Sequence, residues 1–172
     1  HNRTALACLE PRIHAVSTLE EVDGPAVLIR SHGVPPAVLA KAEQRGLQVI
    51  DATCPCVVRV QRLAREATEQ GRQAIIFGDA AHPEVIGICG WAGGRALVIP
   101  SAEAARDLPC FERVTLLAQT TESAAEYAAA AAALRDKTPD LKVESTLCAG
   151  AQQVQQATYQ AAGQVDAMIV IG

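Results

Sequence analysis

The feature that most constrains the fold of this chain is a regular alternation of short apolar runs with longer segments of helical pattern. The apolar runs predict strands over 14–16, 26–29, 47–50, 74–77, 96–99, 114–118, 142–147 and 167–171. The intervening segments predict helices over 2–9, 36–46, 57–70, 101–108, 122–136 and 152–162, and a further helix starting at Pro83. Alternating strands and helices of these lengths are typical of α/β proteins with parallel sheets.

Two of these segments carry further expectations. Residues 26–29 are continuously apolar, which predicts a strand covered on both faces. Residues 122–136 include a run of alanines, and they predict the longest helix of the chain.

The composition narrows the class of protein. In 172 residues, 49% hydrophobic residues are enough for a real core, whereas a net charge of −4 and 3% aromatic residues make nucleic acid an unsuitable partner. No apolar run approaches the length needed to cross a membrane. Six cysteines in such a chain indicate reduced thiols and metal ligands rather than a disulfide framework, so we expect a cytoplasmic protein.

The ends of the sequence suggest a fragment. The chain starts at His1 without a methionine, and it stops at Gly172 where the last predicted strand reaches its loop. We therefore expect that the natural protein is longer.

The reactive side chains gather where predicted strands end. Seven of them follow the carboxyl end of a strand: His32, Cys54, His82, Glu84, Thr120, Thr121 and Cys148. In open parallel sheets ligands bind beyond this edge. Core residues would show no such preference, so the pattern predicts one site at the strand ends.

Cys54 is the most informative of these residues. Pro55 suits the first turn of a helix, which places Cys54 beside the positive end of that helix, where a thiolate is favoured. A small buried side chain is the alternative interpretation. Cys148 shares the setting 94 residues later, and two distant cysteines that converge from separate α/β units suit an iron–sulfur cluster.

The other cysteines carry weaker signals. Cys54 and Cys56 are one residue too close for the C-x-x-C spacing of a zinc hook or a thiol redox protein, so Cys56 is at most a secondary ligand candidate. Core packing is the better interpretation of Cys8, Cys89 and Cys110.

A polar pocket is the second prediction for the strand ends. His82-Pro83-Glu84 offers an imidazole that could bind an anion and a carboxylate that could transfer a proton. A phosphate pocket without a lysine is predicted from three histidines and two threonines: His1, His32, His82, Thr120 and Thr121. Neither a P-loop nor a Gly-x-Ser-x-Gly pattern occurs, which argues against nucleotide binding and serine hydrolysis.

Five motifs resemble, in order, those of hydroxymethylbutenyl diphosphate reductase, the LytB-type iron–sulfur enzyme that ends the non-mevalonate isoprenoid pathway. They are Arg30-Ser31-His32-Gly33-Val34, Asp51-Ala52-Thr53-Cys54-Pro55, His82-Pro83-Glu84-Val85, Gln119-Thr120-Thr121 and Thr146-Leu147-Cys148. His1-Asn2 also resembles the first diphosphate-binding histidine of the family. The resemblance extends over almost the whole chain.

The resemblance implies a trefoil of three small α/β units around a central 4Fe-4S cluster. The units would be residues 1–54, 55–147 and 148–172, with the first and third incomplete. Three cysteines would hold three irons, leaving the fourth iron open to the allylic oxygen of the substrate. The first of these cysteines would precede His1, and a Ser-Ser-Asn stretch of the diphosphate pocket would follow Gly172.

The resemblance also implies a reaction and its residues. The reaction is reductive dehydroxylation of 4-hydroxy-3-methylbut-2-enyl diphosphate to isopentenyl and dimethylallyl diphosphate, with ferredoxin or flavodoxin as electron donor. The hydroxyl group leaves as water, and the allyl fragment takes a proton. The resemblance implies that Cys54 and Cys148 are cluster ligands. It implies that the diphosphate is contacted by His1, His32 and His82. Glu84 would be the proton source, and Thr120 would be its hydrogen-bonded neighbour near the substrate hydroxyl.

Some residues depart from the family pattern. Ala151 and Val154 stand where the family usually has a threonine and an arginine, and Cys56 replaces an apolar residue. Cys8 is a conceivable third ligand, although it lies inside a predicted helix. The alternative hypothesis is a diverged, non-catalytic α/β domain that binds a phosphorylated ligand or a partner.

Overall fold

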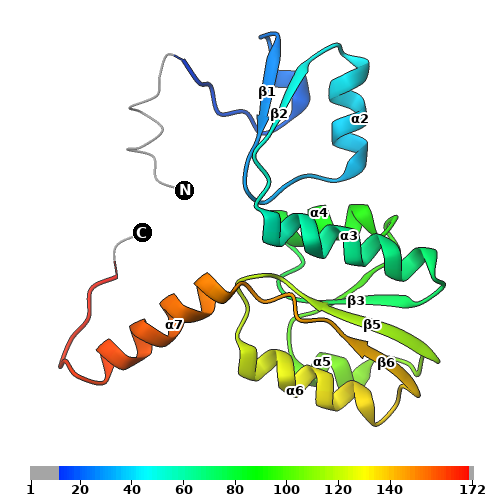
Figure 1. Cartoon of the computed structure of the whole chain (residues 1–172), viewed down its shortest axis with the longest axis vertical. Coiled ribbons are helices and arrows are strands. Elements are labelled where there is room, and N and C mark those ends of the chain that lie inside the picture. The colour runs from blue at the N-terminus through cyan, green and yellow to red at the C-terminus, as the bar shows by residue number, and fades with distance from the viewer. Residues whose placement is uncertain (1–11, 171–172) are drawn as a thin grey trace.

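The computed structural model describes residues 12–170 and consists of two parallel sheets with their helices (Figure 1). The predicted helix over 2–9, with His1 and Cys8, lies outside the described residues. In chain order the elements are η1 (Leu19–Glu21), β1 (Ala26–Ile29), α2 (Pro36–Gln44), β2 (Gln48–Asp51), α3 (Pro55–Glu69), β3 (Gln73–Phe77), α4 (Pro83–Trp91), β4 (Leu97–Ile99), α5 (Ala102–Asp107), β5 (Arg113–Ala118), α6 (Ala124–Arg135), β6 (Asp140–Val143) and α7 (Ala149–Ala162).

Both sheets are parallel, which confirms the predicted α/β class. β1 pairs with β2, and the larger sheet has the order β4-β3-β5-β6. Because β3 and β5 are adjacent, the loops that follow them lie side by side at one edge. No helix in residues 12–170 is long and apolar enough to cross a membrane.

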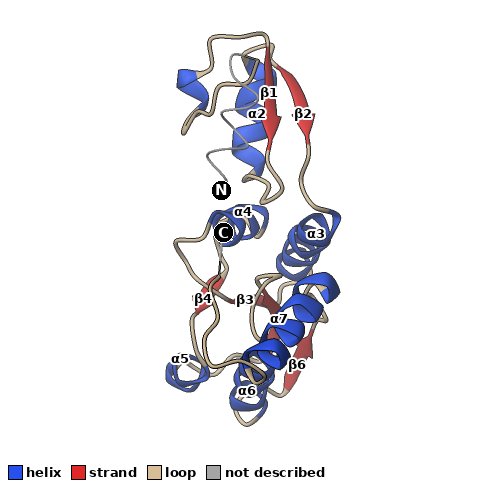
Figure 2. Ribbon diagram, turned by 90° about the vertical axis from the view of Figure 1, so that its left-hand side faces the viewer, coloured by secondary structure: helices blue, strands red, loops and turns tan. Residues whose placement is uncertain are grey.

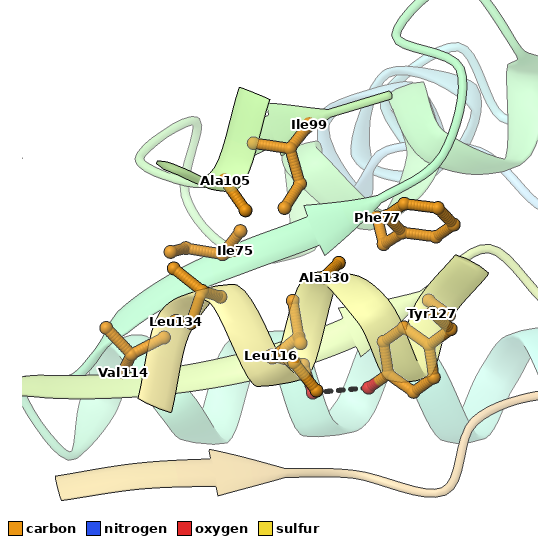
Figure 3. Packing of buried hydrophobic residues seen from close by; sticks show 11 residues of the cluster. Ile75, Phe77, Ile99, Ala105, Val114, Leu116, Tyr127, Ala130 and Leu134 are labelled. Atoms are coloured by element: carbon orange, nitrogen blue, oxygen red, sulfur yellow. Dashed lines mark hydrogen bonds between the residues drawn. The ribbon is translucent and has the colours of Figure 1, made fainter. Parts of the chain in front are cut away.

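The larger sheet has an apolar core on each face. α3 and α4 cover one face, and α5 and α6 cover the other (Figures 1 and 2). On the α6 face, Phe77, Leu116 and Tyr127 pack together, and the Tyr127 hydroxyl donates to the Leu116 carbonyl at 2.9 Å (Figure 3). The sequence of α3 carries an apolar stripe at helical spacing, and all five of its residues are buried, as expected for an amphipathic helix: Val57, Val60, Leu63, Ala64 and Ala67.

The β1–β2 sheet differs from the prediction of a strand covered on both faces. Leu28 is 55% exposed and Ile50 is 48% exposed, because α2 packs on one face of the two strands and nothing in residues 12–170 covers the other. The prediction was wrong because an apolar run shows which residues can be buried but does not supply the layer that buries them.

The two terminal strand predictions were also wrong. Residues 14–16 and 167–170 are exposed and contain no strand. Neither segment has a strand partner in the described part of the chain, and a β-strand without a partner leaves its backbone groups unpaired.

Two further predictions need correction. β6 ends at Val143 rather than at Leu147, because the Thr146 hydroxyl takes the place of a ladder residue and accepts a hydrogen bond from the Ala118 N–H at 2.8 Å. α6 has 12 residues and is shorter than α3, which has 15, because Ser123 caps the helix and starts it two residues later than predicted.

The loop after β1 packs closely against α4. Gly33 has φ +67°, a conformation that favours glycine. A Cβ on Gly90 would lie 2.5 Å from the Pro35 Cβ, so only glycine allows this approach. The Trp91 indole N–H donates to the Val34 carbonyl at 3.1 Å. These contacts, which we call the junction, hold the loop that carries His32 against the end of α4.

Candidate functional site

A buried carboxylate forms the centre of the site. Glu84 lies in the first turn of α4 and is 2% exposed, and Thr120 follows β5 and is 5% exposed. The Thr120 N–H donates to Glu84 Oε1 at 2.7 Å, and the Thr120 hydroxyl donates to Glu84 Oε2 at 3.0 Å. Both carboxylate oxygens are therefore held in place, which suits a group that exchanges a proton at a defined position.

His82 is the N-cap of α4, and its ring is oriented by that helix. The Glu84 N–H donates to His82 Nδ1 at 3.2 Å. Because Nδ1 accepts, a neutral His82 carries its proton on Nε2 and can donate that proton to an anion. Neither the imidazole nor the carboxylate of the His-Pro-Glu turn is isolated, since one backbone N–H links them.

His32 comes from the loop after β1 and meets His82 edge to face. The ring centroids are 5.1 Å apart at an interplanar angle of 78°. Partial burial lowers the pKa of His32, and the nearby charges of His82 and Arg30 lower it further. Two imidazoles this close resist double protonation, so an anion between or beside them would relieve an unfavourable interaction.

Cys148 is connected to the carboxylate through Thr120. The Cys148 N–H donates to the Thr120 carbonyl at 2.8 Å, and Cys148 is the N-cap of α7. The backbone N–H groups of Ala151 and Gly150 lower the pKa of the Cys148 thiol, and a contact with Cys56 contributes in the same direction. This position favours a thiolate, as predicted for a cysteine at the start of a helix.

Cys54 occupies the equivalent position at α3. It is the N-cap, Pro55 is the first helical residue, and the Cys54 N–H donates to the Ser31 carbonyl at 2.9 Å. Cys56 lies in the first turn of the same helix, and its sulfur is 4.0 Å from the Cys148 sulfur. This contact, followed by burial and by the neighbouring Cys54, raises the pKa of the Cys56 thiol.

The structure thus brings together most of the predicted site residues that it describes. Glu84, Thr120, His82 and His32 form one contiguous group, and Cys148 is joined to it by a backbone hydrogen bond. Thr121 does not join the group, since it is exposed and its hydroxyl accepts from the Gln119 side chain. His1 lies outside the described residues.

Sequence reasoning missed two polar residues near the site. Glu122 is half-buried, and burial raises its pKa, as do the charges of Glu126 and Asp79. Gln61 is 5% exposed inside the apolar stripe of α3 and packs against Gly33 and Gly87. The signal for Gln61 was available, because a polar residue interrupts an otherwise apolar helical stripe there.

The side chains that could act as metal ligands limit the kind of metal group that the site can hold. Among residues 12–170, no group of three or more His, Cys, Asp or Glu side chains is arranged to hold a metal ion. The described chain offers two half-buried thiols at helix starts, Cys54 and Cys148. Thiolates of this kind fit an iron–sulfur cluster that takes further ligands from elsewhere.

Comparison with known proteins gives consistent relatives. The model of the family described as LytB protein matches residues 1–172. The 4-hydroxy-3-methylbut-2-enyl diphosphate reductase of Dehalococcoides mccartyi strain BAV1 is 36% identical over 178 residues, which cover 100% of this chain and 63% of that protein. The reductase of the same name from Alkaliphilus oremlandii is 34% identical over 173 residues, with 100% and 62% covered. The chain therefore spans less than two thirds of the length of these curated relatives.

Solved structures show the same similarity. A structure titled as (E)-4-hydroxy-3-methyl-but-2-enyl diphosphate reductase, the terminal enzyme of the non-mevalonate pathway, aligns with a TM-score of 0.78 at 33% identity and covers 100% of this chain and 63% of its own. The structure of the E-1-hydroxy-2-methyl-but-2-enyl-4-diphosphate reductase from Plasmodium falciparum aligns with a TM-score of 0.85 over 96% of this chain and 54% of its own. Its 24% identity shows a shared fold.

Proposed function

This chain belongs to the LytB protein family, and from that premise we propose that it forms part of a 4-hydroxy-3-methylbut-2-enyl diphosphate reductase. The reaction would replace an allylic hydroxyl by hydrogen, consuming two electrons and two protons and releasing water. One observation carries the proposal: Thr120 binds Glu84 through its N–H and hydroxyl and binds Cys148 through its carbonyl. Thr120 therefore positions both the carboxylate of Glu84 and the residue that carries the Cys148 thiol.

Glu84 would supply the proton that lets the hydroxyl leave as water. Its carboxyl group is buried, and both oxygens face Thr120, whose hydroxyl can also turn toward a substrate hydroxyl. A chain of substrate hydroxyl, Thr120 hydroxyl and Glu84 would carry the proton without bulk water. Thr120 thus acts both as an anchor of Glu84 and as a substrate contact.

The diphosphate would bind at the two histidines. His82 presents Nε2–H because Nδ1 is occupied by the Glu84 N–H, and His32 stands at its edge. Burial and the nearby positive charges lower the pKa of His32 in the ligand-free protein. The negative charge of an arriving diphosphate would act in the opposite direction and favour protonated His32. His1 is the third contact that the sequence predicts.

Cys54 and Cys148 would hold a 4Fe-4S cluster. Both are N-caps of helices, and the pKa of Cys148 is lowered by two N–H groups of α7, which favours its thiolate. Such a cluster supplies electrons one at a time to the reaction. The contribution of this chain is to hold Cys148 next to Thr120 and Cys54 next to the loop after β1.

The wider assignments belong to the same proposal. Of the proposed units 1–54, 55–147 and 148–172, the first two are supported as separate units by the separate pairing of the two sheets. Ferredoxin or flavodoxin would be the electron donor. A cytoplasmic location suits free thiols, since the five described cysteines are all unpaired by disulfides.

The experiment that tests the acid role is Glu84→Gln in the full-length protein, with Glu103→Gln as matched control. Glu103 also lies in the first turn of a helix, α5, but is exposed at 74% of its side chain. We expect Glu84→Gln to lower kcat by about 10²- to 10⁴-fold, with the visible spectrum of the cluster unchanged, and Glu103→Gln to retain wild-type turnover. Full turnover in Glu84→Gln would refute the acid role.

The cluster assignment needs its own measurement. Iron and acid-labile sulfide per chain should fall in Cys54→Ala and in Cys148→Ala, and Cys110→Ala should bind as much iron as the wild type because Cys110 is exposed and remote from the site. A wild-type protein that binds the diphosphate but holds no iron and does not turn over would favour the non-catalytic binding domain instead.

A further inference from the structure

Among residues 12–170, Cys56 is the one cysteine near the site that the proposed function does not use. Its sulfur lies 4.0 Å from the sulfur of Cys148, although 92 residues separate the two in the chain. Both side chains are half-buried, so small solutes can reach them. Of the three remaining thiols of residues 12–170, Cys54 is also half-buried but is already used as a proposed cluster ligand, Cys89 packs against the core beneath α3 and α4, and Cys110 is exposed in a loop.

The contact between these sulfurs is held by the backbone on both sides. Cys56 lies in the first turn of α3, and the next turn of that helix is tied to the segment before Cys148 because the Arg59 guanidinium donates to the Ser145 carbonyl at 2.8 Å. Cys148 is anchored by its own N–H on the Thr120 carbonyl. The fold therefore places the two thiols next to each other. A disulfide would require the sulfurs to move closer by about 2 Å.

We propose that Cys56 is the resolving thiol of Cys148: when the cluster is absent, the two form a reversible disulfide that masks this cluster ligand. The regulatory meaning rests on the proposed function, whereas the disulfide itself does not. Oxidation would thereby block cluster insertion, and reduction would restore the ligand.

The chemistry balances with a hydroperoxide as oxidant. The Cys148 thiolate attacks one oxygen of hydrogen peroxide, the O–O bond breaks, and Cys148 becomes a sulfenic acid with loss of hydroxide. The Cys56 thiol then attacks the Cys148 sulfur, an S–S bond forms, and water leaves. Two thiols lose two electrons in total, and one peroxide becomes two waters.

The disulfide would also protect the site. A sulfenic acid without a resolving thiol reacts with a second hydroperoxide to give sulfinic acid and water, and cellular thiols cannot reverse that step. Cys56 would intercept Cys148 before that step. A chain with an apolar residue at position 56 would lack this protection, and that difference makes the inference testable.

The test uses the full-length protein, freed of iron by chelation under anaerobic conditions and then exposed to an excess of hydrogen peroxide, because sulfinic acid forms only with a second peroxide. Peptide mapping without reductant should recover a 56–148 cross-link in the wild type and in the control Cys89→Ala. Cys56→Ala should lack it and carry about tenfold more sulfinic acid at Cys148. Cys56→Ser, which preserves the side-chain volume, should behave as Cys56→Ala and guards against an effect of packing.

Iron uptake gives a second readout. After oxidation, the wild type should take up iron only once dithiothreitol has been added, whereas Cys56→Ala should stay refractory. Equal sulfinic acid at Cys148 in the wild type and Cys56→Ala, or a cross-link from Cys54 in place of 56–148, would overturn the inference. A 56–148 cross-link in a protein without reductase turnover would instead refute the proposed function and leave the disulfide intact.

Discussion

The two sheets of this chain contrast in how completely they are buried. In the larger sheet, Leu116 and Leu117 are fully buried, because helices cover both faces. In the smaller sheet, Leu28 and Ile50 are about half exposed, because helix α2 lies on one face only. Both sheets are parallel, and Leu28 and Ile50 are as apolar as Leu116 and Leu117, so the type of side chain does not explain the difference.

The contrast shows where the site obtains its rigidity. Glu84 and Thr120 belong to the unit of the larger sheet, and Cys148 is bound to Thr120 through its N–H, whereas His32 follows a strand of the smaller sheet. The loop that carries His32 is held against α4 by the junction at Pro35, Gly90 and Trp91. We therefore expect local stability to be high around the acid and lower around His32.

A matched pair of leucine substitutions tests the contrast most strongly. Leu116→Ala should cost about 2–5 kcal/mol of unfolding free energy, because it opens a cavity in a closed core. Leu28→Ala, also in a strand, should cost less than about 0.5–1 kcal/mol, because that side chain is already 55% exposed. Urea unfolding of the full-length protein measures both. Equal costs would mean that the open face of β1–β2 is covered in the complete protein.

The junction can be loosened without touching either sheet. Gly90→Ala places a Cβ 3.0 Å from the Pro35 Cα and should cost about 1–3 kcal/mol by overpacking. Amide exchange should quicken in β1, β2 and the His32 loop, and β3 and β5 should keep their protection. Gly24→Ala is the control, because a Cβ there meets nothing within 4 Å. Uniformly faster exchange in both sheets would contradict the separate stability of the two regions.

The smallest expected effect is a pH dependence at His32. Its pKa in the folded protein is lowered by burial and by His82, so the unfolded chain binds the proton more readily. This contribution to stability is present above the ordinary pKa of 6.5 and is lost as the pH falls through the lowered value. Between pH 7.5 and 5, the wild type should lose more stability than His32→Gln in urea unfolding. Parallel pH profiles would show that His32 does not report on the junction.

Much of the local structure could be predicted from the sequence. The interior strands and helices, the helix starts at Pro55 and Pro83, and the apolar stripe of α3 follow from periodicity and capping, which depend on neighbouring residues. Strands were wrongly predicted at 14–16 and 167–170, because these segments have apolar character but no partner strand. Their failure reflects tertiary context, because a strand forms only where another strand pairs with it.

The sequence by itself determined the fold class, the family motifs and the placement of reactive residues after strands. Only the tertiary structure decided which of those residues meet. Glu84 and Thr120 are 36 residues apart and Cys56 and Cys148 are 92 apart, and each pair is created by chain segments that no local pattern connects. The order β4-β3-β5-β6 sets these neighbours. Strand order depends on packing between distant helices and strands, so it lies beyond what the periodicity of the sequence can encode.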